Sequence, residues 1–156
     1  MHNEDENAKA LAAIEAGMVA IRRRQTRRAL ARGFAEVDPA LFDVVDAVEA
    51  GEQLRRPMTV TDVAAALDVA QPRASKLVAA AVEAGLIRRE ADQRDGRRAL
   101  LARTVAGREL CERVHRSRRG RFARATEHWT AAERATFAQL LTRFVEGLTE
   151  PGPGRH

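Results

Sequence analysis

Arginine is the residue in this chain whose number and spacing most plainly indicate a chemical role. Residues 86–124 hold 13 arginines against five acidic residues. Three of these arginines, Arg94, Arg97 and Arg98, surround the pair Asp95-Gly96, which is a common turn signal. Guanidinium groups on an exposed turn attract polyanions through charge and paired hydrogen bonds. A solvated surface would show the same excess of charge. Only the secondary-structure elements around the turn can distinguish a polyanion-binding site from such a surface.

Two short strands are predicted on either side of this turn. The first begins at Leu86, and the second covers residues 99–103. An Asp-Gly pair between such strands is a strong hairpin signal. Arg88, Arg89 and Arg103 flank the strands, where we expect them to contact phosphate or to remain solvated.

A pair of helices is predicted directly before the hairpin. Thr59 and Asp62 have the spacing of a capping box, which begins the first helix. A short turn follows at residues 68–70, and the second helix runs over residues 71–84 until Gly85 stops it. A helix pair followed by a basic hairpin is a winged helix-turn-helix, an arrangement that binds DNA with its second helix in the major groove.

The first two turns of that second helix carry polar side chains suited to base recognition. Glutamine and arginine form paired hydrogen bonds with adenine and guanine, and arginine also suits a narrow minor groove. Asp95 can hold the guanidinium of Arg97 in a bidentate pair, or it can serve only the turn. The predicted DNA-binding residues are Gln71, Arg73, Ser75, Lys76, Arg94, Asp95, Arg97 and Arg98.

A long helix is predicted over residues 8–34, and Gly33 ends its apolar pattern. Its apolar residues step by three and four, which is the narrow seam of a coiled-coil contact. The seam consists of Leu11, Ile14, Met18 and Ile21. Asp38 and Pro39 begin a further helix, which Gly51 closes. Because no helical partner follows the seam in the same hairpin, we expect a second subunit to cover it.

Two more helices are predicted after the hairpin. Thr104 caps one that extends to about residue 127, and Thr130 with Glu133 forms a capping box for the last. The last helix is apolar on one stripe, like the first. The predicted fold is mainly α with a small β-hairpin. Its parts are dimerisation helices at 8–37 and 105–150, a winged helix-turn-helix DNA-binding lobe at 38–104, and flexible tails at 1–7 and 151–156.

Composition narrows the class of protein. The chain of 156 residues has a formal net charge of +5 and one cysteine, which excludes an intrachain disulfide and a multi-cysteine zinc site. No apolar run approaches a membrane span and no signal peptide heads the chain, so the expected compartment is the cytoplasm. The sequence has no phosphate-binding glycine loop and no nucleophile with a placed base. We therefore expect no enzymatic activity, no cofactor and no metal.

Four segments together resemble the MarR family of bacterial transcriptional regulators: 63–78, 83–89, 92–101 and 104–107. The family's Asp-x-Arg wing motif falls on Asp95 and Arg97. Its Leu-Thr-Pro-x-Gly link falls on residues 103–107, with arginine in place of leucine and valine in place of proline. Ala70 replaces the serine usual before the recognition helix, which weakens the helix cap. The resemblance implies a homodimer with intertwined terminal helices and one lobe in each of two successive major grooves.

The resemblance also implies a pocket for small aromatic anions between the first, second and fifth helices. Their positions on the helices make five residues candidates to line this pocket: Met18, Arg22, Gln25, Cys111 and His115. A role in packing or on the surface fits each of them as well. Cys111 and His115 also have the i, i+4 spacing of two metal ligands, but the sequence offers no cluster that completes a site.

The sequence thus predicts a sequence-specific regulator that binds double-stranded DNA as a homodimer. The leading form of this hypothesis is a repressor of a pseudo-palindromic operator, released by a small ligand resembling an aromatic acid. The alternative is an architectural DNA-binding protein of the same fold that responds to no ligand.

Overall fold

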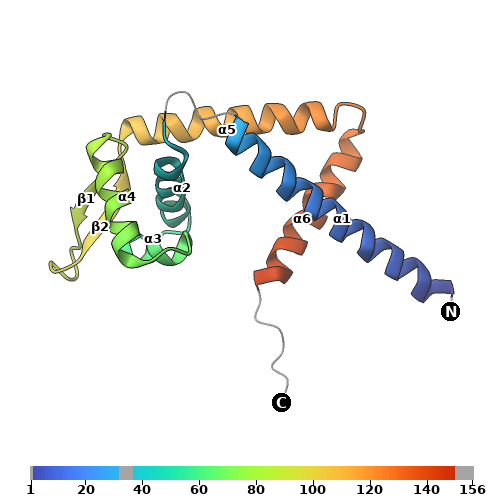
Figure 1. Cartoon of the computed structure of the whole chain (residues 1–156), viewed down its shortest axis with the longest axis horizontal. Helices are drawn as coiled ribbons and strands as arrows, with labels where there is room; N and C mark the ends of the chain where they lie inside the picture. The colour runs from blue at the N-terminus through green and yellow to red at the C-terminus, as the bar shows by residue number, and fades with distance from the viewer. Residues whose placement is uncertain (1, 32–36, 150–156) are drawn as a thin grey trace, which may run out of the picture. The chain divides into compact units, whose positions relative to one another are not determined.

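The computed structural model describes the backbone of residues 2–31 and 37–149 and the side chains of residues 4–24 and 37–148. The chain divides into two compact units, residues 1–111 and 112–156. Figure 1 shows eight elements in the described ranges, so the mainly α fold with one hairpin is confirmed. They are α1 (His2–Ala31), α2 (Pro39–Gln53), α3 (Val60–Ala66), α4 (Gln71–Glu83), β1 (Ile87–Ala91), β2 (Ala99–Arg103), α5 (Val105–Ala125) and α6 (Ala131–Thr149).

Helices α2, α3 and α4 pack with the hairpin into a winged-helix lobe within the first unit. Helix α2 contacts α3, α4 and β2. Helix α4 contacts β1, and Figure 1 shows the two side by side. The apolar faces of the three helices are buried at Val44, Val45 and Val48 of α2, Val63 of α3, and Val78 of α4. These small aliphatic side chains bring the helix backbones close together, which fits a chain with only 4% aromatic residues.

The hairpin forms where the turn signal predicted it. Strands β1 and β2 are antiparallel, from the pair Ile87 and Arg103 at the base to the pair Ala91 and Ala99 near the tip. A bridge that the sequence did not reveal pairs Met58 with the other edge of β2, where the Leu101 N–H donates to the Met58 carbonyl at 2.8 Å. The hairpin is therefore attached to the segment between α2 and α3 as well as to its own strands.

Helix α2 does not end where the sequence predicted. Its N-cap is as expected, because the Asp38 carboxylate accepts from the backbone N–H of Ala40. The helix continues to Gln53, however, so the expectation that Gly51 closes it was wrong. Gly51 is needed for space instead, since a Cβ there would lie 2.5 Å from Cγ of Met58 and 2.8 Å from the Arg56 carbonyl oxygen.

Helix α1 also differs from the prediction at its start. It begins at His2, so residues 2–7 are helical and the expected flexible tail over residues 1–7 was wrong. Glu4 and Asp5 lie in the first turn, where negative charge favours a helix. The predicted stop at Gly33 and the predicted tail at 151–156 lie outside the described residues.

Both terminal helices carry exposed apolar faces in the single chain. The predicted seam of α1, from Leu11 to Ile21, is 40% to 59% exposed. In the second unit, α6 begins with the predicted capping box of Thr130 and Glu133, and Trp129 packs edge-on against Phe137. The exposed apolar residues of α6 are Phe137, Leu140, Leu141, Val145 and Leu148.

Candidate nucleic-acid interface

Helix α4 separates its side chains into an exposed polar face and a buried apolar face. Ala74, Val78 and Ala81 are fully buried against the lobe. The four residues predicted to contact DNA on this helix are all exposed: Gln71, Arg73, Ser75 and Lys76. The structure thus leaves all four side chains exposed, as contact with DNA would require, and their role in base recognition stays a prediction.

The start of α4 is uncapped by any side chain. Ala70 occupies the N-cap position with extended backbone and makes no side-chain cap hydrogen bond, as the replacement of serine predicted. The preceding turn contains Asp68 at φ 52°, a left-handed conformation that aspartate tolerates better than most residues. Pro72 has no N–H, and the Arg73 N–H donates to the Ala70 carbonyl at 3.0 Å, so the first turn of α4 offers an anion at most the N–H of Gln71.

The tip of the wing is ordered by two aspartates acting on the backbone. The Asp95 carboxylate accepts from the Arg97 N–H at 3.1 Å, and the Asp92 carboxylate accepts from the Arg94 N–H at 2.9 Å. The Arg98 N–H donates to the Asp95 carbonyl at 2.9 Å and closes the turn. Of the two roles considered for Asp95, the turn role is the one observed. The hydrogen bond from the Arg97 N–H to the Asp95 carboxylate fixes few rotatable bonds. An ion pair with the Arg97 guanidinium would also have to fix the long arginine side chain, at a greater cost in conformational entropy.

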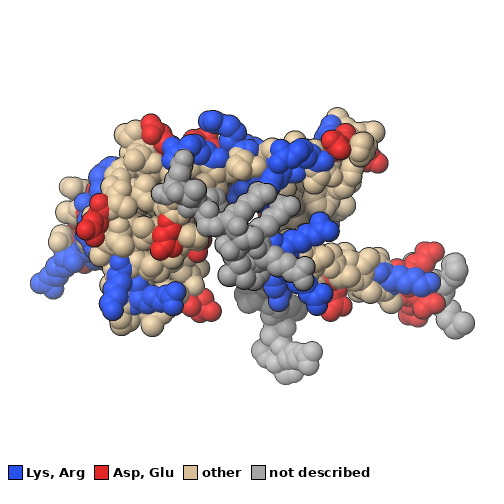
Figure 2. Space-filling view, turned by 45° about the horizontal axis from the view of Figure 1, so that its top comes forward, with Lys and Arg blue, Asp and Glu red and all other residues tan. Residues whose placement is uncertain are grey.

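This backbone role leaves the wing guanidinium groups available. Arg94, Arg97 and Arg98 are exposed. Within the described part of the chain, the guanidinium groups of Arg94 and Arg97 make no hydrogen bond or ion pair. Figure 2 shows basic side chains projecting at the end of the lobe where the hairpin lies. The guanidinium groups of Arg94 and Arg97 are therefore exposed and without a bonded partner in the described part of the chain, although Asp92 and Asp95 lie on the same turn.

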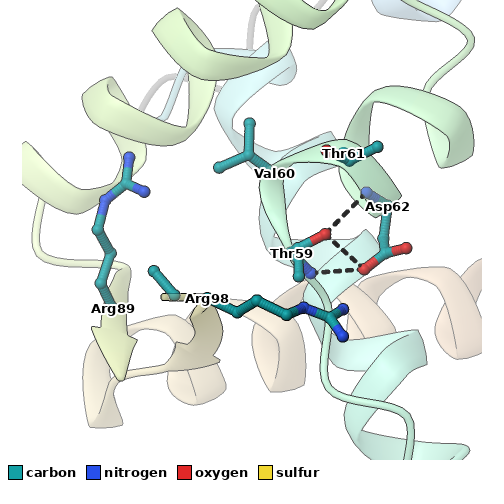
Figure 3. A pocket seen from close by; sticks show the side chains of 7 residues that line it. Thr59, Val60, Thr61, Asp62, Arg89 and Arg98 are labelled. Atoms are coloured by element: carbon teal, nitrogen blue, oxygen red, sulfur yellow. Dashed lines mark hydrogen bonds between the residues drawn. The ribbon is translucent and has the colours of Figure 1, made fainter. Parts of the chain in front are cut away.

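A groove of about 450 Å³ lies between the start of α3 and the hairpin (Figure 3), and no pattern in the sequence predicted it. Arg89 of β1 stands on one side, and Arg98 extends along the groove towards Thr59 and Asp62. The remaining lining residues are Val60, Thr61 and Ala99. Each motif was visible in the sequence, but only the fold brings the capping box and the two arginines together.

The one carboxylate in this groove is already engaged. Asp62 Oδ2 accepts from the Thr59 backbone N–H and from the Thr59 hydroxyl, both at 2.7 Å. These hydrogen bonds from the Thr59 hydroxyl and N–H, aided by the charge of Arg98, lower the pKa of Asp62. The groove thus offers two guanidinium groups against one hydrogen-bonded carboxylate, a balance that favours an anion.

Arg103, expected to contact phosphate or to be solvated, does neither. Its side chain is only 11% exposed and pairs with two glutamates of α2. Nη1 donates to Glu49, and Nε donates to Glu52 Oε2 at 2.9 Å. Burial by itself would lower the pKa of Arg103, but the hydrogen bonds with Cys111 and Glu52 and the charges of both glutamates raise it above its ordinary value. Arg103 is therefore a permanently charged structural residue at the base of the wing.

The predicted ligand-pocket residues are not brought into the groove. Met18 and Arg22 are exposed on α1, and the side chain of Gln25 lies outside the described residues. Cys111 is fully buried in the lobe, where burial raises the pKa of its thiol against a hydrogen bond with Arg103. His115 is half-buried in the second unit. Their role as a pocket stays a prediction.

Two kinds of site are absent from the described ranges. No group of three or more His, Cys, Asp or Glu side chains in them has the arrangement of a metal site. No helix in them is long and apolar enough to cross a membrane.

A model of the MarR family matches residues 37–98, the span from the start of α2 to the end of the wing turn. Over these residues, which are less than half of the chain, the winged-helix segment is similar to the MarR family. The resemblance noted in the sequence is thereby confirmed for segments 63–78 and 83–89 and for residues 92–98, while residues 99–101 and the link at 104–107 lie beyond the match. No curated protein matches the chain as a whole.

Solved structures similar to the chain include further MarR-type proteins. A MarR family protein from Bacillus stearothermophilus is 17% identical with a TM-score of 0.71, over 94% of this chain and 98% of that one. S. aureus MepR bound to ethidium bromide is 20% identical with a TM-score of 0.59, over 88% and 96%. A MepR mutant bound to an oligodeoxyribonucleotide is 19% identical with a TM-score of 0.56, over 88% and 97%. At these identities the likeness shows a shared MarR-type fold.

Proposed function

We propose that the chain is a sequence-specific DNA-binding transcription regulator, not an enzyme, and that it acts in the cytoplasm on double-stranded DNA. The observation that carries the proposal is the pairing of an exposed polar face on α4 with unpartnered wing guanidinium groups on one MarR-type lobe. Gln71 and Arg73 would read base edges in the major groove. Arg97 would enter the minor groove, where negative potential is concentrated.

The groove beside α3 extends this interface to the DNA backbone. Arg89 and Arg98 line it together with the hydroxyl-bearing residue Thr61. Guanidinium and hydroxyl groups are the usual donors to phosphate oxygens. We propose that this groove of the protein binds a phosphate of the DNA backbone, next to the DNA major groove that α4 would enter. Such a contact would fix the register of the lobe without reading sequence.

We further propose that the protein is a homodimer in which the terminal helices provide the contacts. The support is the apolar seam of α1 and the apolar stripe of α6, both exposed in the single chain. Exposed apolar patches of this kind mark protein interfaces. Two lobes related by a two-fold axis would read the two halves of a pseudo-palindromic operator.

The finer proposal is that the protein represses transcription and that a small aromatic anion releases it. S. aureus MepR has been solved bound to ethidium bromide, an aromatic ligand that is a cation, so support for an anionic ligand must come from the residues of this chain. In this chain, the Nε of Arg121 on α5 is buried with no hydrogen-bond partner among the described residues. Leaving such a donor unpaired costs about 1–3 kcal/mol. An anionic ligand or the second subunit would supply the missing acceptor.

A thermal-shift titration with benzoate separates this repressor from the ligand-independent architectural alternative. A ligand that binds only the folded protein raises Tm with concentration. A rise that the variant Arg121→Met abolishes would support an effector site. A flat response to benzoate and to larger aromatic acids would favour the architectural protein, with the second subunit as the partner of Arg121.

DNA binding itself is tested by selecting bound genomic fragments with the purified protein and measuring affinity for the recovered sites. Arg97→Ala should weaken binding to every site by about tenfold or more, and Arg73→Ala should change which sites are preferred. Arg119→Ala, which removes an exposed positive charge from α5, is the matched control. An affinity that does not depend on salt, or an Arg97→Ala variant that binds as well as Arg119→Ala, would refute the interface.

A further inference from the structure

At the base of the wing, both the main chain and the side chain of Arg103 are hydrogen-bonded to glutamates of α2. Glu52 uses its two carboxylate oxygens separately: Oε1 accepts from the Arg103 backbone N–H at 2.8 Å, and Oε2 accepts from Nε at 2.9 Å. Glu49, itself only 8% exposed, accepts from Nη1. Helix α2 thereby fixes both the position of the last residue of β2 and the direction of its side chain.

The carbonyl of Arg103 adds a second layer of contacts. It accepts from Nη1 of Arg88 on β1 and from Nη1 of Arg108 on α5, each at 2.9 Å. Arg88 is held in turn by Glu90 on the same strand. One residue therefore joins α2, both strands of the hairpin and the first turn of α5. We call the three side chains at its centre, Glu49, Glu52 and Arg103, the wing-base cluster.

Stability alone is a weak reason for this cluster. A buried ion pair is often no better for stability than well-packed apolar side chains of similar size. An apolar residue such as leucine at this position would fill space but would give no direction. Hydrogen bonds are directional, and a two-stranded hairpin is marginal in water unless something holds it. What the cluster adds over leucine is therefore a fixed orientation of the hairpin on α2.

We propose that Glu49 and Glu52, acting through Arg103, are positioning residues that set where the wing tip meets DNA. The inference rests on the proposed DNA-binding function, since it concerns the placement of Arg97. Neither glutamate would touch DNA, because both carboxylates are directed into the lobe by their bonds to Arg103. The two glutamates should therefore affect the affinity for DNA only by changing the position of the wing.

A double-mutant cycle on the full-length protein tests this route. Glu52→Gln keeps the shape of the side chain but leaves one of its two terminal atoms unable to accept a hydrogen bond. The variant should weaken DNA binding by about tenfold in the wild-type background and in Arg73→Ala. In Arg97→Ala it should cost less than about twofold, because the wing contact is already lost. Glu112→Gln, which removes an exposed carboxylate near Arg119 at 3.9 Å, is the matched control.

Equal losses in the Arg73→Ala and Arg97→Ala backgrounds would overturn the proposal, because they would indicate a general loss of folded protein. If Glu52→Gln fails to fold, Arg103→Lys replaces it, since lysine keeps the charge but lacks the planar fork. It should show the same dependence on Arg97.

Hydrogen exchange in the DNA-free protein gives a second readout that does not require DNA binding. Two amides report on the hairpin: the Asp92 N–H, bonded to the Arg98 carbonyl, and the Leu101 N–H, bonded to Met58. Glu52→Gln should speed exchange at both, and Glu112→Gln should not. Faster exchange in a protein that binds no DNA would refute the proposed function while leaving the wing-base cluster supported. Unchanged exchange would overturn the cluster's role whatever the DNA result.

Discussion

Gly107 lies in the first turn of α5 against the main chain that leads into β1, and it is the most constrained glycine of the lobe. A Cβ at this position would lie 2.0 Å from the Leu86 carbonyl oxygen and 3.1 Å from its carbon. Carbon and oxygen normally approach to no less than about 3.3 Å. Because the obstructing atoms belong to the backbone, Gly107→Ala must push α5 away from Leu86 by roughly 1 Å.

That displacement acts on contacts which tie α5 to the lobe. The Leu86 carbonyl accepts from the backbone N–H and from the hydroxyl of Thr104, both at 3.1 Å. Losing both hydrogen bonds costs about 2 kcal/mol, and strain in a packed core adds about 1–3 kcal/mol. The better helix propensity of alanine offsets about 1 kcal/mol of this loss of unfolding free energy. The expected net loss is about 2–4 kcal/mol of unfolding free energy.

Thermal and urea unfolding at equal protomer concentration measure this loss, which should lower Tm by on the order of 10 °C. Gly120→Ala in α5 is the matched control, because a Cβ at Gly120 meets only Nη1 of Arg124, at 3.9 Å. That variant should gain up to about 1 kcal/mol. If Gly107→Ala is as stable as the wild type to within about 0.5 kcal/mol, the close approach of α5 to Leu86 is wrong.

Two further predictions concern a helix cap and the proposed dimer. Thr59→Ala should cost about 1 kcal/mol at pH 7. Because hydrogen bonds from Thr59 hold the pKa of Asp62 below its ordinary value, their contribution is present above about pH 4 and lost as the pH falls through the folded-state pKa. The difference in urea midpoint between Thr59→Ala and wild type should therefore shrink towards pH 2, and a constant difference would contradict this assignment. Leu140→Glu, on the exposed apolar face of α6, should convert the dimer to monomers in sedimentation velocity, whereas Glu146→Gln should not; an unchanged dimer would exclude that face from the interface.

The parts of the structure that the sequence predicted well depend on neighbours close along the chain. The span of β2 and the capping boxes at Thr59 and Thr130 follow from residues two to four positions apart. The exposed and buried faces of α4 follow from helical period alone. Patterns of this length are governed by local backbone geometry, which the sequence displays directly.

The features that could not be predicted depend on distant partners. Arg103 has the same sequence signature as a phosphate-binding arginine, and only the fold shows Glu49 and Glu52 beside it. The groove similarly joins the capping box to arginines about 30–40 residues further along. Gly51 looked like a helix stop because the approach of Met58 is invisible in a helical pattern. In each case a tertiary contact overrides the local signal.

The wing-base cluster also restricts the order in which this sequence can change. Replacing Arg103 by leucine first would strand the carboxylates of Glu49 and Glu52 near each other without their shared cation. Replacing either glutamate first would leave a mostly buried guanidinium short of acceptors. Removing one partner of a buried charge pair typically costs about 3–5 kcal/mol, a large part of the stability of a small protein. The three residues should therefore be inherited together, and close relatives should carry either the whole charged set or a wholly apolar one.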